Sequence, residues 1–165
     1  EAKNALGDNA EQEIDWLIKL ISEIRSVRSA LNVPVAAMVL LQIKDAASLS
    51  QQRLKAHEAT IRRLARVDSI AAVAAAPKQA AQVVLNEMTI FLPLADVIDL
   101  GAERVRLEKE SQKLKQEIGK LAQKLANDDF VAKAPPEVVA EQRQRLQEQE
   151  AVLVKLQQAW QAVAE

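Results

Sequence analysis

The stretch LEKESQKLKQEIGKLAQKL, residues 107–125, decides the fold because its apolar side chains recur in a coiled-coil pattern. The apolar positions are seven, four, three and four residues apart, and Ser111 fills the one polar position among Leu107, Leu114, Ile118, Leu121 and Leu125. This spacing places the side chains on one face of an α-helix, where they form an a/d seam with a partner helix.

A second series of the same kind predicts the partner helix. Its members are Val139, Leu146, Leu153, Leu156, Trp160 and Val163, with Gln142 and Gln149 at the polar positions. Between the two series lies NDDFVAKAPP, which is rich in helix-ending residues and predicts only a turn, with Asp128 and Asp129 ending the first helix. The two halves are nearly equal in length, so residues 102–164 predict an antiparallel helical hairpin about 40 Å long. A projecting hairpin encloses no catalytic pocket.

Composition limits the classes of function. The chain has 165 residues, a formal net charge of −1 and no cysteine. The absence of cysteine excludes disulfides, zinc–thiolate sites and thiol nucleophiles. The near-zero net charge provides no global field for nucleic acid, so any RNA contact must rest on local patches and none is expected with DNA. No apolar run reaches the ~18 residues that span a bilayer, and we expect a soluble cytoplasmic protein without a membrane partner.

Residues 1–33 predict one helix. Ile14, Leu17, Ile18, Ile21, Ile24, Val27 and Leu31 recur at helical spacing over residues 11–31. The polar residues before them predict a frayed start, with Asp8 or Asn9 as the cap. Asn32 and Pro34 end the helix.

Residues 34–100 predict a small α+β subdomain. We expect a buried strand over residues 35–43, a helix from Ser48 or Ser50 to about Val67, and a short strand over residues 69–76. Residues 81–94 then read as two strands joined by a two-residue turn at Asn86-Glu87. The fold class is therefore α+β: an N-terminal helix (1–33), a small mixed α/β subdomain (34–100) and a long antiparallel coiled-coil hairpin (101–165).

No set of side chains in this chain predicts catalysis or a metal site. His57 is the single histidine and lies on a predicted helix, so it is interpreted as a surface residue. Asp128 and Asp129 point apart on a helix and have no third ligand nearby. With three glycines in the chain, no phosphate-binding loop motif occurs.

The basic residues of the first hairpin helix are more informative. They form one outward stripe, spaced three, four, seven and four residues apart: Arg106, Lys109, Lys113, Lys120 and Lys124. Five aligned cations could follow a phosphate backbone. The alternative is a solvated face on which Glu108, Glu110 and Glu117 pair locally with these cations.

Other polar and aromatic residues leave alternatives open. The helix at residues 48–67 has a local excess of cations that could touch phosphate, with one Glu58 against Arg53, Lys55, Arg62, Arg63 and Arg66. These residues point several ways, so a solvated face is favoured. Arg25 and Arg28 are expected to hold carboxylates or helix-end carbonyls. Phe130 and Val131 either plug the hairpin tip, which we favour, or form an exposed apolar tip. Trp160 is assigned to packing in the seam.

Three stretches resemble a known family. FVAKAPPEVVAEQRQRL, residues 130–146, is similar to the turn and return helix of the C-terminal coiled coil of bacterial valyl-tRNA synthetases. IRSVRSALNVP, residues 24–34, resembles the end of the anticodon-binding helical bundle of those enzymes. FLPLADVIDLGAERVRLEKE, residues 91–110, resembles the junction that enters the coiled coil. The resemblance covers nearly the whole chain in the right order, whereas the HIGH and KMSKS motifs of the catalytic domain do not occur.

The resemblance implies a tRNA-binding C-terminal region of a larger valine–tRNA ligase. In that family the coiled coil lies against the outer corner of the tRNA, where the D and T loops meet. The implied RNA-contact residues are Arg106, Lys109, Lys113, Lys120, Lys124, Lys133, Arg143 and Arg145. The parent would use ATP and magnesium to attach valine to its tRNA, edit mischarged threonine and be monomeric, while this region itself would hold no cofactor and no catalytic residue.

Two other functions remain open. A coiled-coil protein-interaction module would recruit a partner through its tip or seam, bind no RNA and self-associate. The end of a different class I synthetase is the second alternative, which the KAPPEVV sequence at residues 133–139 argues against.

Overall fold

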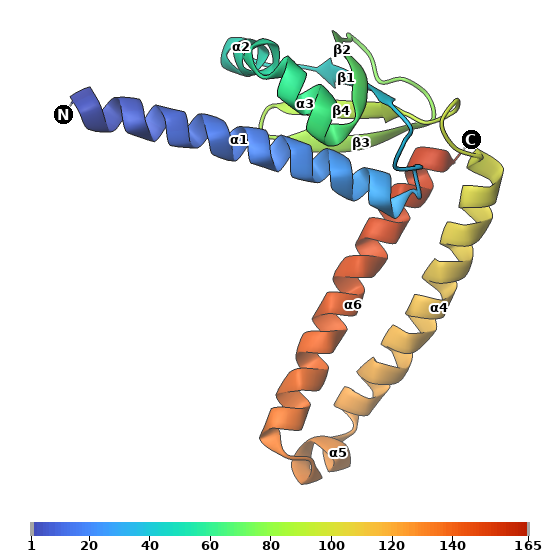
Figure 1. The fold of residues 1–165 in the computed structure, drawn as a ribbon. Coiled ribbons are helices and arrows are strands. Elements are labelled where there is room, and N and C mark those ends of the chain that lie inside the picture. Colours follow the sequence, from blue (N-terminus) through green and yellow to red (C-terminus); the bar gives the residue numbers. More distant parts are fainter. Residues whose placement is uncertain (1, 165) are drawn as a thin grey trace. The chain divides into compact units, whose positions relative to one another are not determined.

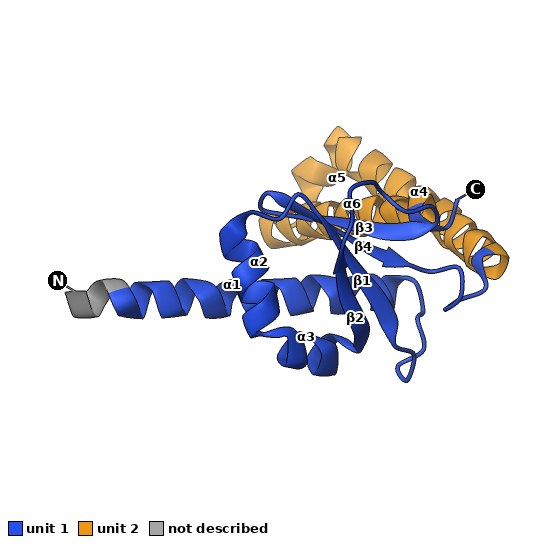
Figure 2. Cartoon of the chain, turned by 90° about the horizontal axis from the view of Figure 1, so that it is seen from above, with its two compact units in different colours: residues 1–100, 162–165 blue, residues 101–161 orange. Residues whose placement is uncertain are grey.

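A computed structural model describes residues 2–164 of the chain, with side chains from Leu6 onward. The chain forms two compact units, residues 1–100 with 162–165 (unit 1) and residues 101–161 (unit 2) (Figure 2). The observed elements confirm the α+β class: a long helix, a mixed four-stranded sheet with two short helices, and then long helices (Figure 1). No helix in the described part is long and apolar enough to cross a membrane.

The first helix, α1, spans Ala2–Ala30 and is longer than the sequence pattern predicts. The frayed start and the cap at Asp8 or Asn9 are wrong, because Gly7 and Asp8 lie inside the helix. One glycine disfavours a helix by only about 1 kcal/mol. The predicted end is confirmed, since Asn32 adopts a left-handed φ of 53° directly before Val33 and Pro34.

The predicted apolar face of α1 is confirmed at Ile21, Ile24 and Leu31, which are buried, and is wrong at Ile14 and Ile18. Trp16, Leu20 and Ile24 are buried at spacings of four residues, whereas Ile14 and Ile18 are 54% and 57% exposed. The large indole of Trp16 sets the inward face, and the aliphatic residues two positions away consequently point outward. Within unit 1, α1 contacts a later helix, α3 (Glu58–Ala65), and strand β3 (Ala80–Leu85).

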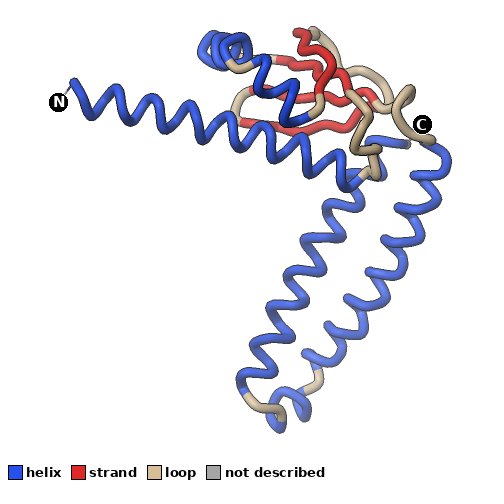
Figure 3. The backbone as a smooth tube through the Cα atoms, viewed as in Figure 1, coloured by secondary structure: helices blue, strands red, loops and turns tan. Residues whose placement is uncertain are grey.

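Four strands form the sheet of unit 1, and their bounds are β1 Val39–Lys44, β2 Val67–Ala72, β3 Ala80–Leu85 and β4 Met88–Pro93. The strand order is β2-β1-β4-β3, with β1 parallel to β2 and the other pairs antiparallel. Figure 3 shows these strands in red. The tight turn at Asn86-Glu87 is confirmed, because Leu85 pairs with Met88 and Asn86 has a φ of 54°. Parallel β1 and β2 require a crossover, which two helices supply.

The crossover helix is broken, whereas the sequence predicted one continuous helix to Val67. Helix α2 spans Ser48–Ala56 and helix α3 spans Glu58–Ala65, with His57 between them at φ −109° and ψ 16°. Arg66 then ends α3 in the left-handed conformation, and β2 begins at Val67. The strand predicted at 69–76 therefore begins two residues earlier and ends at Ala72.

Arg28 on α1 explains why the first strand begins at Val39 instead of residue 35. Its buried guanidinium donates to the carbonyl oxygens of Pro34 (3.0 Å), Ala37 (2.7 Å) and Arg66 (3.3 Å). These bonds hold residues 34–37 as a loop and confirm the expectation that Arg28 binds carbonyls, one of them at the end of α3. Burial lowers the pKa of Arg28, and the nearby charge of Arg66 lowers it further.

Most of the core of unit 1 lies on one face of the sheet, although Phe91 of β4, which points to the other face, is buried as well. Strand β1 alternates, with Val39, Leu41 and Ile43 buried and Leu40 43% exposed. Ile61 of α3 is fully buried, and Ile90 of β4 is only 1% exposed. This alternation is typical of a sheet with one face covered by helices.

The hairpin of unit 2 consists of α4 (Leu100–Ala126), α5 (Asp128–Lys133) and α6 (Pro136–Val163). Helices α4 and α6 run side by side and α5 joins them at the far end (Figure 1). The tip is more ordered than the predicted turn. Asp128 and Asp129 begin α5 instead of ending α4, because the Asn127 side chain accepts hydrogen bonds from the backbone N–H groups of Asp129 (3.0 Å) and Phe130 (3.4 Å).

The predicted seam is confirmed along α4 and most of α6. Leu107, Leu121 and Val139 are buried, and the remaining seam residues up to Leu156 are half-buried. Trp160 is wrong as a seam residue, since it is 40% exposed while Ala159 beside it is buried. The last residues of α6, Ala162 and Val163, are buried and belong to unit 1, so the face of the helix that is buried changes where the hairpin ends.

Candidate functional site

The cation stripe of α4 comprises Arg106, Lys109, Lys113, Lys120 and Lys124. At 3.6 residues per turn these five positions fall within about 60° of the helix circumference. The stripe lies away from the seam: its four lysines are exposed, whereas Leu107 and Leu121 are buried. The helix therefore holds four ammonium groups along one outward line.

Arg106 differs from the lysines because it is held by carboxylates of its own helix. Its guanidinium donates to Glu103 Oε2 at 2.6 Å and to Glu110 Oε1 at 3.0 Å, and the Glu103 side chain is only 12% exposed. The hydrogen bond from Glu103 raises the pKa of Arg106, and Glu110 contributes in the same direction. The guanidinium of Arg106 is thus held by Glu103 and Glu110, and these ion pairs stabilise the first turns of α4.

The four lysines have no such partners. In the described part of the chain, none of Lys109, Lys113, Lys120 and Lys124 forms an ion pair. Local pairing through Glu108 and Glu117, the alternative considered for this face, does not occur, and Glu110 pairs with Arg106 alone. Lys124 Nζ instead lies 4.8 Å from the centroid of the Phe130 ring.

The tip contributes a further exposed cation. Lys133 ends α5 and is exposed, while Phe130 and Val131 are half-buried. The contact of Phe130 with Lys124 packs the ring against α4. This packing agrees with the interpretation of Phe130 as a plug of the hairpin tip.

The two candidate arginines of α6 are not brought together. Arg143 and Arg145 are both exposed, but two residues on a helix point about 160° apart. A ligand on one side of α6 can therefore contact at most one of these two arginines. Counting the charges of α6 does not show that Arg143 and Arg145 face opposite sides of the helix, whereas the helical period does.

Sequence reasoning missed the role of Glu103. The i,i+3 spacing of Glu103 and Arg106 was the available signal, because oppositely charged side chains at this spacing meet on a helix. Lys115 on α4 and Lys155 on α6 are exposed too, but lie outside the stripe.

No arrangement of catalytic groups or metal ligands accompanies these cations. No group of three histidine, aspartate or glutamate residues that could hold a metal occurs among the described residues. His57 Nε2 lies 2.6 Å from Glu13 Oε1 of α1, and this contact connects the crossover to α1. It is a half-buried structural residue.

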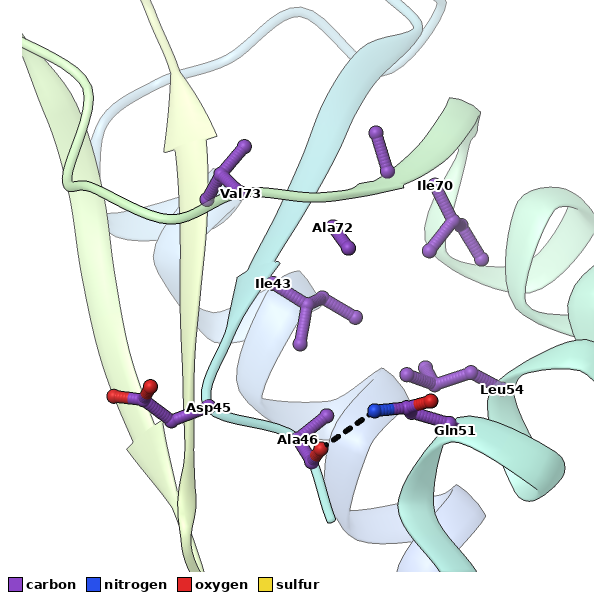
Figure 4. A pocket seen from close by; sticks show the side chains of 9 residues that line it. Ile43, Asp45, Ala46, Gln51, Leu54, Ile70, Ala72 and Val73 are labelled. Carbon is purple, nitrogen blue, oxygen red and sulfur yellow. Dashed lines mark hydrogen bonds between the residues drawn. The ribbon is translucent and has the colours of Figure 1, made fainter. Parts of the chain in front are cut away.

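A hollow of about 270 Å³ lies between β1, β2 and α2 in unit 1 (Figure 4). Its walls are mainly apolar, from Ile43, Leu54 and Ile70. The amide of Gln51 is engaged with the carbonyl oxygen of Ala46 at 2.8 Å. No nucleophile with an adjacent base lines it, so the hollow carries no catalytic arrangement.

Comparison with known proteins finds similarity for the hairpin and for nearly the whole chain. Residues 99–164 match the family described as valyl tRNA synthetase tRNA binding arm. The chain is 50% identical over 141 residues to the valine–tRNA ligase of Mesorhizobium japonicum, which is 86% of this chain and 15% of that protein. It is 45% identical over 158 residues to the valine–tRNA ligase of Agrobacterium fabrum, or 96% of this chain and 17% of that protein. The chain thus spans about one sixth of the length of these relatives.

Proposed function

We propose that this chain, whose residues 99–164 belong to the valyl-tRNA synthetase tRNA-binding arm family, binds tRNA through the cation stripe of α4. The observation that carries the proposal is the line of four exposed lysines without carboxylate partners in the described chain. Such a line of cations can follow a phosphate backbone, to which lysine binds as a point charge. With two Trp, two Phe and no Tyr, the chain offers no platform for stacking bases, so contact is to the shape and backbone of the RNA.

The hairpin acts by tethering. Once the rest of a longer ligase has bound the tRNA elsewhere, the arm meets the outer corner of the same molecule at high effective concentration. Weak intrinsic affinity is then sufficient. The arm positions the tRNA and supplies no reacting group.

The activity of the whole protein is part of the same proposal. It is an ATP- and magnesium-dependent valine–tRNA ligase that edits mischarged threonine, is monomeric and acts in the cytoplasm. Its preferred RNA partner is valine tRNA. Residues 1–33 form the terminal helix of the anticodon-binding bundle, residues 34–100 a rigid mount, and residues 101–165 the arm.

The exposure of α1 supports its assignment to a helical bundle. Leu6 is 72% exposed, and Ile14 and Ile18 are more than half exposed on a helix that buries its other face in unit 1. A helix that is apolar on two faces is suited to burial on both. Replacing Ile14 and Ile18 by Asp should leave the stability of this chain unchanged and destabilise a longer protein that contains the whole bundle.

The deciding experiment is binding of the chain to a valine tRNA transcript over a salt series. Changing Lys109, Lys113 and Lys120 to Glu should weaken binding at least tenfold. It should also reduce the slope of the logarithm of the binding constant against the logarithm of the salt concentration by about one per lost phosphate contact. The matched control changes Lys78, Lys115 and Lys155 to Glu, which alters the net charge equally but lies outside the stripe. Equal loss in both variants would contradict a site on the stripe and leave only nonspecific attraction.

The alternative of a protein-interaction module is tested in the same series. Val152, Val154 and Trp160 expose apolar surface on α6, as a partner-binding helix would. That function predicts no RNA binding, and self-association of the chain in sedimentation velocity that Trp160→Ala abolishes.

A further inference from the structure

A second concentration of positive charge lies in unit 1, on the crossover between β1 and β2. Residues 48–66 contain five arginine and lysine residues and one carboxylate, Glu58, although the whole chain has a net charge of −1. The exposed members at the end of α3 are Arg62, Arg63 and Arg66, here called the α3 arginine cluster. Charge is therefore segregated within the chain.

The guanidinium groups of the cluster are not neutralised. Arg62 and Arg66 are four residues apart, and none of the three arginines forms an ion pair in the part of the chain that the structure describes. Glu58 precedes Arg62 by four residues, a spacing that permits pairing, yet no such pair forms. Arg106 of the hairpin, held by two carboxylates, shows the opposite arrangement.

The position of Arg66 is fixed by its backbone. It ends α3 with φ 53° and ψ 55°, and its carbonyl oxygen accepts a hydrogen bond from Arg28 Nη1 at 3.3 Å. Glycine or asparagine is usual at such a left-handed helix end, because other side chains are strained there. An arginine at this position keeps a guanidinium at the α3–β2 junction despite that preference.

Arg28 and Arg66 place two positive charges close together. Burial lowers the pKa of Arg28, and the charge of Arg66 adds to this effect, while no carboxylate among the described residues compensates Arg66. Cations in the last turn of a helix do interact favourably with its free carbonyl groups, which accounts for Arg62 and Arg63. It does not account for Arg66, which lies beyond the helix and whose carbonyl oxygen accepts a hydrogen bond from the Arg28 guanidinium. A bound anion would offset this repulsion.

We infer that the α3 arginine cluster binds phosphates of the RNA backbone and forms a second RNA contact of the chain, separate from the hairpin. The inference rests on the proposed function, because it takes the same tRNA as ligand. Arginine suits this role since its planar fork donates two parallel hydrogen bonds to a phosphate. All three members of the cluster are arginines, whereas four of the five stripe residues on α4 are lysines.

The test removes charge from the cluster in the complete 165-residue chain. Arg62→Gln with Arg63→Gln is compared with Lys44→Gln with Lys78→Gln, which removes the same charge from unit 1 outside the cluster; Arg66 is left unchanged because its backbone is strained. Binding to a valine tRNA transcript is measured over a salt series, and thermal unfolding checks the fold. The cluster variant should raise Kd about tenfold and reduce the salt slope by about one per arginine, whereas the control should change Kd less than twofold. Restoring charge with Arg62→Lys and Arg63→Lys should recover part of the affinity.

Each outcome is decisive. The inference is overturned if the cluster variant binds like its control while the change of Lys109, Lys113 and Lys120 to Glu weakens binding. That result leaves the proposed function intact and favours a protein partner for the cluster. A chain that binds no tRNA overturns both. If affinity for tRNA falls in the cluster variant but not in the stripe variant, the result supports the cluster and contradicts the hairpin as the RNA site. Losses on both that multiply in the combined variant support two independent contacts.

Discussion

At the scale of single residues, the side chains of Arg28, which is buried, and Glu87, which is exposed, connect elements that are distant in sequence. Arg28 binds three carbonyl oxygens within 3.3 Å across the 34–37 loop and the end of α3. Glu87, in the β3–β4 turn, accepts hydrogen bonds from the backbone N–H of Ala47 at 3.1 Å and from Ser50 Oγ at 2.6 Å. Both residues satisfy backbone groups at helix ends or loops, where regular structure leaves them unpaired.

Arg28→Lys should lower the free energy of unfolding by about 3 kcal/mol, because a lysine cannot satisfy the same spread of carbonyl oxygens and buries a more strongly hydrated charge. Urea denaturation of the chain measures this change. Arg25→Lys is the matched control, since Arg25 is exposed on the same helix, and it should change stability by less than 0.5 kcal/mol, roughly the range for surface substitutions. Equal effects at both positions would contradict the role of the buried guanidinium.

Glu87 predicts a dependence of stability on pH. The hydrogen bond from Ser50 is the main cause that lowers the pKa of Glu87 in the folded chain. A carboxylate with a depressed folded pKa contributes stability that is present above its unfolded pKa of about 4.3 and is lost as the pH falls through the folded value. Glu87→Gln should therefore destabilise the chain at pH 7, by less than about 1 kcal/mol because Glu87 is exposed to solvent, and this cost should shrink as the pH falls toward 3. A constant difference between variant and parent over this range would exclude the carboxylate as the cause.

At the scale of elements, the hairpin has a seam that is only partly apolar. Ser111, Gln142 and Gln149 occupy positions between the leucines, and the side-chain oxygen of Gln149 is buried without a hydrogen-bond partner among the described residues. Polar residues in a coiled-coil seam reduce stability and favour one register and one oligomeric state. The seam thus suits a hairpin that pairs within one chain.

Gln149→Leu should raise the stability of the hairpin by about 1 kcal/mol, because it removes a buried unsatisfied oxygen and adds apolar contact. Thermal unfolding followed by circular dichroism measures the change. Gln147→Leu on the exposed face of α6 is the control and should leave stability unchanged. A gain accompanied by dimer formation would show that the polar position also guards against self-association.

Asn127→Ala should loosen the tip alone. The variant loses the side-chain cap of α5, which is worth about 1 kcal/mol. Amide hydrogen exchange should quicken in residues 128–133, while the exchange of α4 and α6 stays as it was. Faster exchange along all of α6 would mean that the tip holds the two long helices together.

At the scale of the whole molecule, burial is distributed unevenly between the units. In unit 2 the buried apolar residues are Leu107, Leu121, Val139 and Ala159. Unit 1 buries one face of α1 from Trp16 onward, the inner face of its sheet and all of Leu41, Ile61 and Met88. Since apolar burial is the main source of folding free energy, unit 2 should open more easily than unit 1.

Native-state hydrogen exchange measures this difference directly. Amides in the middle of α4 and α6 should exchange with a lower opening free energy than those of β1 and β4. The same ranking should hold in limited proteolysis, with first cuts in the hairpin. Equal protection in both units would contradict the expected difference.

The sequence predicted the elements whose periodicity is strong and missed the local chemistry. The seam of α4, the end of α1 at Asn32 and the turn at Asn86 follow from spacing and from residues that tolerate positive φ. The break at His57 and the exposure of Trp160 do not follow from spacing, because His57 is engaged by Glu13 and the last turn of α6 belongs to unit 1, which are tertiary effects. For the site, spacing predicted the stripe, but only side-chain geometry separates the paired Arg106 from the free lysines.

The path of the chain has a consequence for how the arm could change length. The backbone leaves unit 1 after Leu100 and returns to it at Ala162, so unit 2 is an insertion with both of its ends fixed to the same body. Deleting seven residues from α4 and the facing seven from α6 would shorten the hairpin by about 10 Å without altering either junction. The arm is in this sense a molecular ruler, whose reach is set by the number of heptads and can be adjusted in matched steps while unit 1 stays unchanged.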